Sequence, residues 1–373
     1  MAPLSTSASS DRLLTLVLPG DPLTATGGYE YDRRILEGLR ALGWTTQVRT
    51  LDHSFPVPTA AALADAHQQL AALPANSLTL IDGLALGAMP DVVHAHAERL
   101  RMVGLVHHPL AAETGLSSEL AAQLFESERR ALAAMRSIVV TSQSTRRSLA
   151  AYGVAAHGVA VVEPGVDQPK DLEIDERPRS PSSAVRMLCV ASVTERKGYD
   201  LLVDALAGLG DLDWTLTCVG DTERSVDTAR ALRMRIEANG QEHRIALTGE
   251  LEGAPLHQQF RAAELFVLAT RFEGYGMVIA QALTYGLPVV STRTGAIAEL
   301  VTPEAGLLVE PDDGAALREA LSRVLSDADL RTRLAAGARA VGATLPGWSA
   351  ASQQFSEILT AVAQRTDDSR AAP

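Results

Sequence analysis

The chain has 373 residues, of which 46% are hydrophobic, and its formal net charge is −12. This length suggests two domains, and the apolar content is sufficient for two substantial cores. The acidic balance argues against nucleic acid as a main partner, because binding a phosphate backbone requires clustered lysine and arginine side chains.

The first half of the chain alternates short apolar segments with segments of helical periodicity. This alternation predicts a parallel sheet with helices on both of its faces. His94 and His96 lie between two of the predicted strands, have no third ligand at a useful spacing, and are expected on the surface. We expect strands at 13–19, 46–51, 78–82, 101–107, 137–141 and 159–163, and helices near 28–42, 59–73, 117–134 and 144–152.

A change in composition separates this half from the next. Residues 167–184 contain Pro169, Pro178 and Pro181 among charged residues and serines, which is typical of a linker. The alternation of strands and helices then resumes. We therefore predict a first domain at 1–166, a linker at 167–184 and a second domain at 185–346. Its strands are expected at 185–191, 215–219, 245–247, 265–268, 289–291 and 307–309, with a helix at 277–286. A last helix is expected after this domain, at 348–364.

Two polar segments follow strands of the first half. Gly27 and Gly28 come after the first strand and open a helix, and a double glycine allows a ligand to approach the backbone closely. His107 and His108 end the fourth strand on the same edge of the sheet, and Glu113 lies in the loop that follows. The alternative interpretations are a tight turn at the glycines and a capping or packing role for the histidines.

The second half contains similar turns that carry more charge. Glu273 lies between a predicted strand and a predicted helix, beside Arg271 and two glycines, and Arg196 with Lys197 occupies another such turn. The amino terminus of a helix presents N–H groups and a partial positive charge, which suits a phosphate group. Added cations would stabilise negative charge that develops on a group bound there. Solvated helix ends are the alternative for each of these charged residues.

These segments together resemble the retaining glycosyltransferases of family 4. The family pattern is a glutamate, seven residues and a second glutamate within a strand-to-helix turn that contains glycine, and residues 271–283 look like it. The segments 285–299 and 306–313 also look like the family. The resemblance implies the GT-B fold, an α/β architecture with two Rossmann-like domains facing a cleft. It also implies that the last helix, within 347–365, crosses back to the first domain.

The resemblance implies roles for the residues of the second domain. Lys197 would clamp the donor diphosphate, Glu273 would contact the hydroxyls of the donor sugar, and Gln281 would contact the ribose. Thr248 follows a predicted strand at the base-binding position of the family, and an ordinary turn is the alternative interpretation there. The other donor-binding candidates are Arg196, Arg271, Gly274, Tyr275, Gly276 and Met277.

In the first domain, the resemblance places the Gly27-Gly28 loop at the cleft. A histidine after the fourth strand faces the transferred sugar in the family, so either His107 or His108 is expected to do so here. Glu113 is an acceptor-side candidate. The Asp211-Leu212-Asp213 segment has the appearance of a metal-binding motif, but it precedes a strand, and we interpret it as a turn.

Two positions depart from the family pattern. Ser192 stands where the family has an arginine, and Arg196 or Arg271 could supply the missing cation. Gln281 stands where the family has its second glutamate, and an amide is a weaker, uncharged acceptor for a ribose diol. These departures leave open a catalytically impaired GT-B protein that binds a nucleotide or serves as a partner subunit. Another GT-B activity, such as a phosphorylase or sugar-phosphate synthase, also stays open.

The resemblance predicts transfer of a sugar from a UDP- or GDP-sugar to a hydroxyl acceptor, with retention of configuration and no metal or other cofactor. The acceptor is expected to be a small molecule, a saccharide or a lipid-linked compound. The segment 1–12 lacks the pattern of a signal peptide, and no apolar run approaches the ~20 residues that span a bilayer. We therefore expect a cytoplasmic protein with at most peripheral membrane association.

Overall fold

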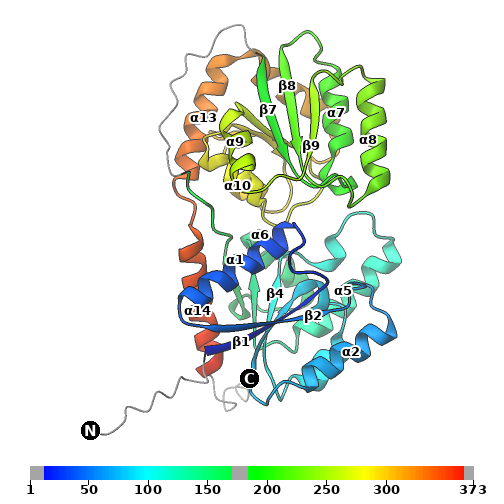
Figure 1. Ribbon diagram of the computed structural model, residues 1–373, viewed down its shortest axis with the longest axis vertical. Coiled ribbons are helices and arrows are strands. Elements are labelled where there is room, and N and C mark those ends of the chain that lie inside the picture. The colour runs from blue at the N-terminus through cyan, green and yellow to red at the C-terminus, as the bar shows by residue number, and fades with distance from the viewer. Residues whose placement is uncertain (1–11, 170–183, 365–373) are drawn as a thin grey trace, which may run out of the picture. The chain divides into compact units, whose positions relative to one another are not determined.

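The computed structural model describes residues 12–169 and 184–364, so that 170–183 of the predicted linker lies outside the described residues. The chain divides into two compact units (Figure 1). The first unit combines Met1–Gly165 with Pro346–Pro373, and the second is Val166–Leu345. The last helix of the chain is therefore part of the first unit.

The first unit is built on a six-stranded parallel sheet with the strand order β2-β1-β3-β4-β5-β6. The order reverses between β1 and β3, and ligands bind beyond the carboxyl ends of strands at such a point. The strands are β1 (Leu13–Pro19), β2 (Thr45–Leu51), β3 (Leu78–Asp82), β4 (Arg101–Val106), β5 (Ser137–Val140) and β6 (Val159–Val161).

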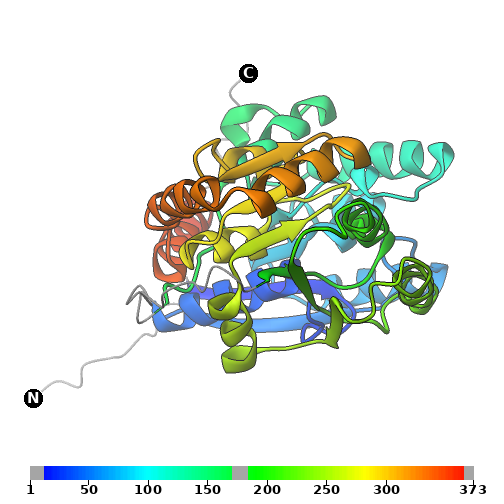
Figure 2. The ribbon, with the colours of Figure 1, turned by 90° about the horizontal axis from the view of Figure 1, so that it is seen from above.

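Helices cover both faces of this sheet (Figures 1 and 2). They are α1 (Gly27–Ala41), α2 (Ala60–Ala71), α3 (Gly83–Leu86), α4 (Pro90–His96), α5 (Ser118–Leu132), α6 (Gln143–Ser148) and α14 (Trp348–Gln364), with 3-10 turns η2 (Leu110–Ala112), η3 (Leu149–Tyr152) and η4 (Ala156–Gly158).

The sequence did not indicate α3 and α4, and this omission explains one wrong prediction. His94 is exposed, as expected, but His96 is buried. One helical turn places His96 on the same face of α4 as Val93, and this face packs against α2. The His96 ring lies 4.8 Å from the ring of His67 on α2.

The last helix, α14, packs against α1 within the first unit. Gly38 makes the close approach of the two helices possible, since a Cβ atom there would lie only 1.9 Å from Ser352 Oγ. The Trp44 indole donates a hydrogen bond to Ser356 Oγ at 2.9 Å. The Arg34 guanidinium lies over the Trp348 ring, 5.1 Å from its centroid, a cation–π arrangement.

The second unit contains another six-stranded parallel sheet, with the order β12-β11-β10-β7-β8-β9. Here the order reverses between β7 and β10. The central strand β10 is fully buried, which explains its uninterrupted apolar sequence. The strands are β7 (Val185–Val190), β8 (Trp214–Val219), β9 (Ile245–Gly249), β10 (Leu265–Leu268), β11 (Val289–Thr292) and β12 (Gly306–Val309).

The helices of the second unit also lie on both faces of its sheet (Figures 1 and 2). They are η5 (Glu195–Lys197, a 3-10 turn), α7 (Tyr199–Ala207), α8 (Val226–Ala238), α9 (Gly253–Ala262), α10 (Met277–Thr284), α11 (Ile297–Leu300), α12 (Gly314–Ser326) and α13 (Ala328–Gly342). Each predicted strand is present in the two sheets, and the predicted α/β class with two Rossmann-like units is confirmed.

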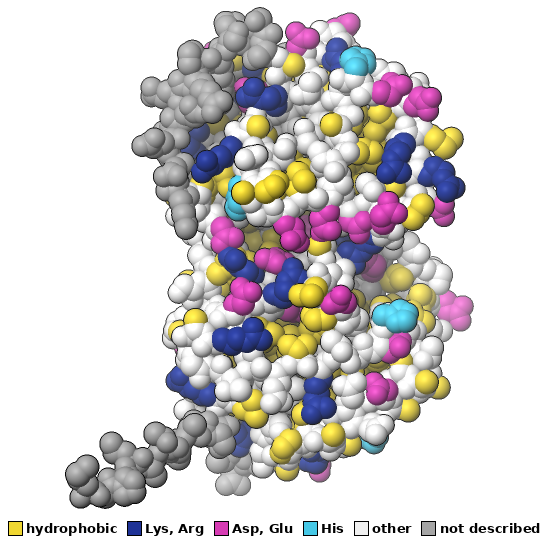
Figure 3. Space-filling model, in the orientation of Figure 1, with side chains coloured by type: hydrophobic (Ala, Val, Ile, Leu, Met, Phe, Trp, Pro, Cys, Tyr) yellow, Lys and Arg dark blue, Asp and Glu magenta, His cyan; other side chains and the backbone are white. Residues whose placement is uncertain are grey.

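The described surface carries charges of both signs. On the face drawn in Figure 3, basic side chains are interspersed with acidic ones. Among residues 12–169 and 184–364, none of the helices has the length and apolar character needed to cross a bilayer.

Candidate active site

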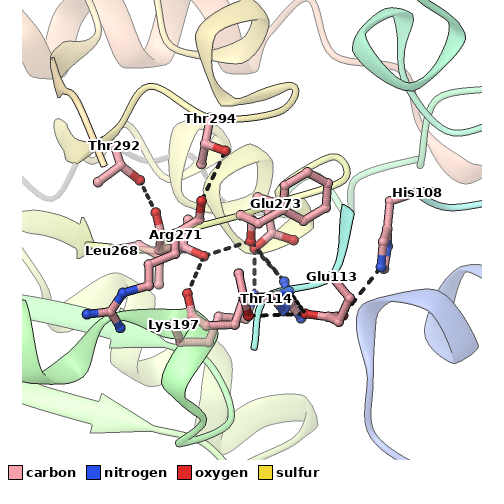
Figure 4. Close-up of polar contacts among 12 residues, drawn as sticks. His108, Glu113, Thr114, Lys197, Leu268, Arg271, Glu273, Thr292 and Thr294 are labelled. Carbon is pink, nitrogen blue, oxygen red and sulfur yellow. Dashed lines mark hydrogen bonds and ion pairs between the residues drawn. The ribbon is translucent and has the colours of Figure 1, made fainter. Parts of the chain in front are cut away.

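Two strands that flank the reversal in the second sheet bring Lys197 and Glu273 together. Lys197 ends η5, which follows β7, and Glu273 lies in the loop after β10. The Lys197 Nζ atom donates a hydrogen bond to Glu273 Oε2 at 2.5 Å (Figure 4). The two side chains are only 12% and 15% exposed. Residues 76 positions apart therefore form one charged pair at the edge where an α/β sheet binds ligands.

Two glycines allow the loops of this site to approach one another. Gly198 has a φ of +64°, and a Cβ atom there would lie 1.9 Å from the Ala269 carbonyl oxygen. Gly295 has a φ of +51°, and a Cβ atom there would lie 1.6 Å from the carbonyl oxygen of Glu273. Any larger residue would push these backbones apart, so both glycines hold the Glu273 loop in position.

The amino terminus of α10 begins directly after the Glu273 loop. Gly276, in the left-handed conformation, is the N-cap residue and has no side chain that could cap the helix. The Tyr275 side chain is buried in the core of this unit. Among Gly274, Tyr275, Gly276 and Met277, the backbone amides are therefore the groups best suited to meeting an anion.

The two arginine candidates differ in their surroundings. Arg196 donates to the Phe272 carbonyl oxygen at 2.9 Å and lies 4.0 Å from Glu273 Oε2. The Arg271 guanidinium instead forms ion pairs with Asp200 and Asp312, each at 2.8 Å. Hydrogen bonding and charge from these carboxylates raise the pKa of Arg271 further. Arg196 is thus better placed as a second cation beside Glu273, whereas Arg271 links α7 to the loop before α12.

Gln281 makes one contact that a glutamate could not reproduce. Its Nε2 donates to the carbonyl oxygen of Asp167 at 2.8 Å, and its Oε1 accepts from the N–H of Asp167 at 3.3 Å. A carboxylate has no donor for the first of these bonds. In this arrangement the amide is occupied by the backbone at the beginning of the predicted linker. The ribose contact implied by the resemblance stays a prediction, and it would require Gln281 to leave Asp167.

Thr248, the base-position candidate, is exposed at the end of β9. Its hydroxyl lies 2.9 Å from the Gly249 carbonyl oxygen. The neighbouring loops carry the carboxylates Asp221, Glu250 and Glu252, and burial with the charges of Glu252 and Asp221 raises the pKa of Glu250.

In the first unit, His107 occupies a buried acidic site. Its Nε2 lies 3.1 Å from Asp32 Oδ1 and 3.6 Å from Asp82 Oδ2. Asp82 ends β3, His107 follows β4, and Asp32 lies on α1. Both aspartates are almost completely buried. Gly28, the second residue of α1, lies close to the imidazole, and a Cβ atom there would lie 3.3 Å from His107 Cδ2.

The electrostatics of this group favour a charged imidazole. Burial opposes the charge on His107, but the charge and hydrogen bond of Asp32 outweigh it and, with Asp82, raise the pKa of His107. Burial and the nearby Asp32 charge raise the pKa of Asp82 above that of an ordinary carboxyl group. The group therefore retains protons at a pH at which exposed side chains of the same types would lose them.

The same three side chains are the candidates for a metal site among the described residues, since their ligand atoms lie within 4.8 Å of one another. A metal ligand would need a lone pair on the imidazole nitrogen. Nε2 lies 3.1 Å from Asp32 Oδ1, and because an ionised carboxylate can only accept a hydrogen bond, Nε2 would carry the proton in that contact. The arrangement thus fits an ion pair, and we do not assign these residues as metal ligands.

His108 points to a different partner. Its Nε2 lies 3.4 Å from Glu113 Oε2 (Figure 4). Glu113 also accepts a hydrogen bond from the Thr114 N–H at 3.0 Å. The two adjacent histidines therefore differ sharply: His107 faces buried carboxylates, and His108 faces a carboxylate that is partly exposed.

Sequence reasoning missed Asp32 and Asp82 as members of the His107 site. Asp82 had a usable signal, since it ends a strand whose carboxyl end lies on the same sheet edge as His107. Asp32 had a weaker signal: a carboxylate three residues before the apolar pair Ile35 and Leu36 on a helix. Only the fold brings it within reach of a histidine 75 residues away.

Comparisons with known proteins agree with this architecture. Residues 184–327 match the family model described as glycosyl transferases group 1, and residues 31–168 match the model of glycosyltransferase family 4. The structure resembles that of Anabaena HepE in complex with UDP-glucose over 93% of this chain and 99% of the other, with a TM-score of 0.71 and 20% sequence identity.

Two curated relatives are similar in sequence. The D-inositol 3-phosphate glycosyltransferase of Xylanimonas cellulosilytica is 28% identical over 64% of this chain, and the alignment covers 60% of that protein. The lipopolysaccharide core biosynthesis mannosyltransferase LpsB of Rhizobium meliloti is 34% identical over 47% of this chain and 50% of its own length. With both units matched by family models, the chain belongs to the group 1 glycosyltransferases of family 4.

Proposed function

We propose that this protein transfers a sugar from a nucleoside-diphosphate sugar to a hydroxyl group of an acceptor, with retention of configuration. The observation that carries the proposal is the Lys197–Glu273 pair at the strand reversal of the second sheet, beside the amino terminus of α10. This arrangement places a cation, a carboxylate and helix amides on one edge of one sheet. Family membership supports the same chemistry.

In this proposal the side chains of the second unit divide the donor between them. Lys197, with Arg196 and the amides of Gly274–Met277, neutralises the charge that develops on the leaving diphosphate. Glu273 accepts hydrogen bonds from the hydroxyls of the transferred sugar. The departing phosphate oxygen takes the proton of the attacking acceptor hydroxyl, so that no side-chain base is required.

The donor we propose is a UDP- or GDP-sugar. HepE binds UDP-glucose, and LpsB is named a mannosyltransferase. The acceptor we propose is a small polar molecule, a saccharide or a lipid-linked compound, and the inositol-phosphate enzyme among the relatives is an example of the first class. A transfer assay identifies both substrates. Purified protein is incubated with pairs of donors and acceptors, and the product is analysed by mass spectrometry.

We further propose that transfer needs no metal ion. The support is chemical: Lys197, Arg196 and the first amides of α10 already supply positive charge where a diphosphate would lie. Activity should therefore survive incubation with EDTA and dialysis. Loss of transfer in EDTA, with recovery on adding Mg²⁺ or Mn²⁺, would contradict this part of the proposal.

One observation favours a second candidate, a nucleotide-binding protein with little transfer activity. The Gln281 amide is bonded to the backbone of Asp167 at the position where the resemblance implies a ribose contact. A thermal-shift screen with nucleotide sugars tests binding, since a ligand at about 100 times its Kd adds about 2.7 kcal/mol of stability. Stabilisation without transfer or donor hydrolysis would favour the second candidate.

A further inference from the structure

The three ionisable side chains of the first unit form a group with one short contact and one longer contact to the same nitrogen. His107 Nε2 is 3.1 Å from Asp32 Oδ1 and 3.6 Å from Asp82 Oδ2. Asp82 Oδ1 is engaged separately, as the acceptor of the Leu84 N–H at 3.0 Å. The aspartates are 3% and 1% exposed, so water screens this group weakly.

The surrounding residues fix the imidazole in one orientation. The edge of Tyr31 packs against the ring, with 5.4 Å between the centroids and an angle of 84°. Gly28 lies close to Cδ2 of the ring, since a Cβ atom at this glycine would be 3.3 Å from Cδ2. The hydroxyls of Thr141 and Thr145 each lie 3.3 Å from the His107 carbonyl oxygen. The ionisable groups around the ring are thus Tyr31 and Asp32 from α1 and Asp82 from β3.

Charge balance explains why the imidazole belongs between the aspartates. Two buried carboxylates close together repel each other, and an uncompensated buried charge is costly. In the described structure, Asp32 Oδ2 has no hydrogen-bond partner, although it is buried. A positive charge on His107 offsets part of this cost, and a proton on Asp82 offsets the rest.

We propose that Asp32 and Asp82 are positioning residues that hold His107 as an imidazolium with its Nε2–H fixed between them. Nδ1, the other ring nitrogen, then also carries a hydrogen and can only donate. The side chain is 19% exposed. This inference rests on the proposed function in one respect: it makes the Nδ1–H of His107 the donor that meets a hydroxyl of the transferred sugar.

Histidine titration by NMR tests the positioning role without any turnover. In the full-length protein, His107 should titrate above the ordinary histidine value of ~6.5. Asp32→Asn should lower the His107 pKa by about one unit or more, because the nearest opposite charge is removed. Asp82→Asn should lower it less, since that carboxyl is farther away and partly protonated. The His107 signal is assigned from its loss in His107→Asn.

Glu113→Gln is the matched control, because it removes the carboxylate beside the neighbouring His108. It should leave the His107 titration unchanged. An unchanged His107 titration in both Asp32→Asn and Asp82→Asn would overturn the proposal. Zn²⁺ binding by calorimetry that disappears in Asp32→Asn would also overturn it, because the group would then be a cation site.

Kinetics then tests the link to the sugar. Asp32→Asn should lower kcat on the order of tenfold, the scale of a charge-assisted hydrogen bond, with little change in the KM for the donor. The two failures can be told apart. A wild-type protein that shows the expected titration but transfers no sugar would contradict the proposed function alone, whereas a normal kcat in Asp32→Asn would overturn the positioning role.

Discussion

The charged sites of the two units differ in how deeply they are buried and in whether their ion-pair partners can be exchanged. In the second unit, one lysine faces one glutamate, and both side chains are partly exposed beside the start of a helix. In the first unit, two aspartates enclose one histidine and are almost completely buried. Lys197 can exchange its partner for an incoming phosphate, because both are anions near solvent. The buried group has its counter-charge built in and suits a side chain that must stay in place.

Among the changes that test this difference, Glu273→Ala should have the largest effect on the rate of sugar transfer. We expect transfer to fall on the order of 10³-fold, the upper range for losing one group that stabilises developing charge. The affinity for free nucleoside diphosphate should change little, because the proposed contact of Glu273 is to the sugar and Lys197 stays in place. Initial rates measure transfer, and calorimetry with UDP and GDP measures binding.

Glu195→Ala is a useful control, since it removes a nearby carboxylate that precedes Lys197 in η5 but makes no described side-chain bond to it. It should retain most of the transfer activity. If Glu273→Ala instead lost nucleotide binding and kept its rate with saturating donor, the assignment of Glu273 to the sugar would be wrong.

Lys197→Ala should reduce transfer by roughly a hundredfold and also weaken nucleoside diphosphate binding. Both effects are expected because the Nζ charge would contact the diphosphate before and after the bond breaks. Lys197→Arg retains the charge and should recover part of the affinity. If Lys197→Ala kept transfer within threefold of wild type, the assignment of Lys197 to the site would be wrong, because the expected loss is far larger.

The contrast between the sites also explains what the sequence could predict. Lys197 and Glu273 each lie in a short segment that joins a buried strand to a helix, so local patterns were sufficient to select them. The order of the strands then brings them together. Asp32 has no such local context, and its contact with His107 depends on how α1 lies across the sheet. The Arg271 ion pairs were missed for the same reason, since Asp200 and Asp312 are distant in sequence.

Glu128→Gln extends the comparison to another buried carboxyl group of the first unit. Glu128 is 1% exposed on α5, and its Oε2 accepts the Leu110 N–H at 3.0 Å. Burial raises the pKa of Glu128 from 4.5 to about 7. The native state therefore binds more protons than the unfolded state between these values, and stability falls as the pH rises through that window.

The glutamine variant removes this charge and retains an acceptor for Leu110. It should be more stable than wild type at pH 8 by about 2 kcal/mol. A pKa shift of one unit corresponds to about 1.4 kcal/mol, and the cost of burying the polar amide cancels part of the gain. Urea unfolding at pH 5 and pH 8 measures the difference. Glu37→Gln, at an exposed position of α1, is the control and should keep the wild-type pH dependence. An equal loss of stability from pH 5 to pH 8 in wild type and Glu128→Gln would contradict the assignment.

The smallest effect is expected at Gln281, where a neutral side chain replaces the family glutamate. Gln281→Ala should weaken nucleotide binding about threefold, as for one neutral hydrogen bond, because the amide is shared with the Asp167 backbone. Gln281→Glu separates the two roles. If residue 281 meets the ribose, the carboxylate should bind nucleotide more tightly than the amide, since a charged acceptor makes the stronger bond. If its main role is to hold Asp167, Gln281→Glu should lose thermal stability like Gln281→Ala and gain no affinity, because a carboxylate cannot donate to the Asp167 carbonyl oxygen.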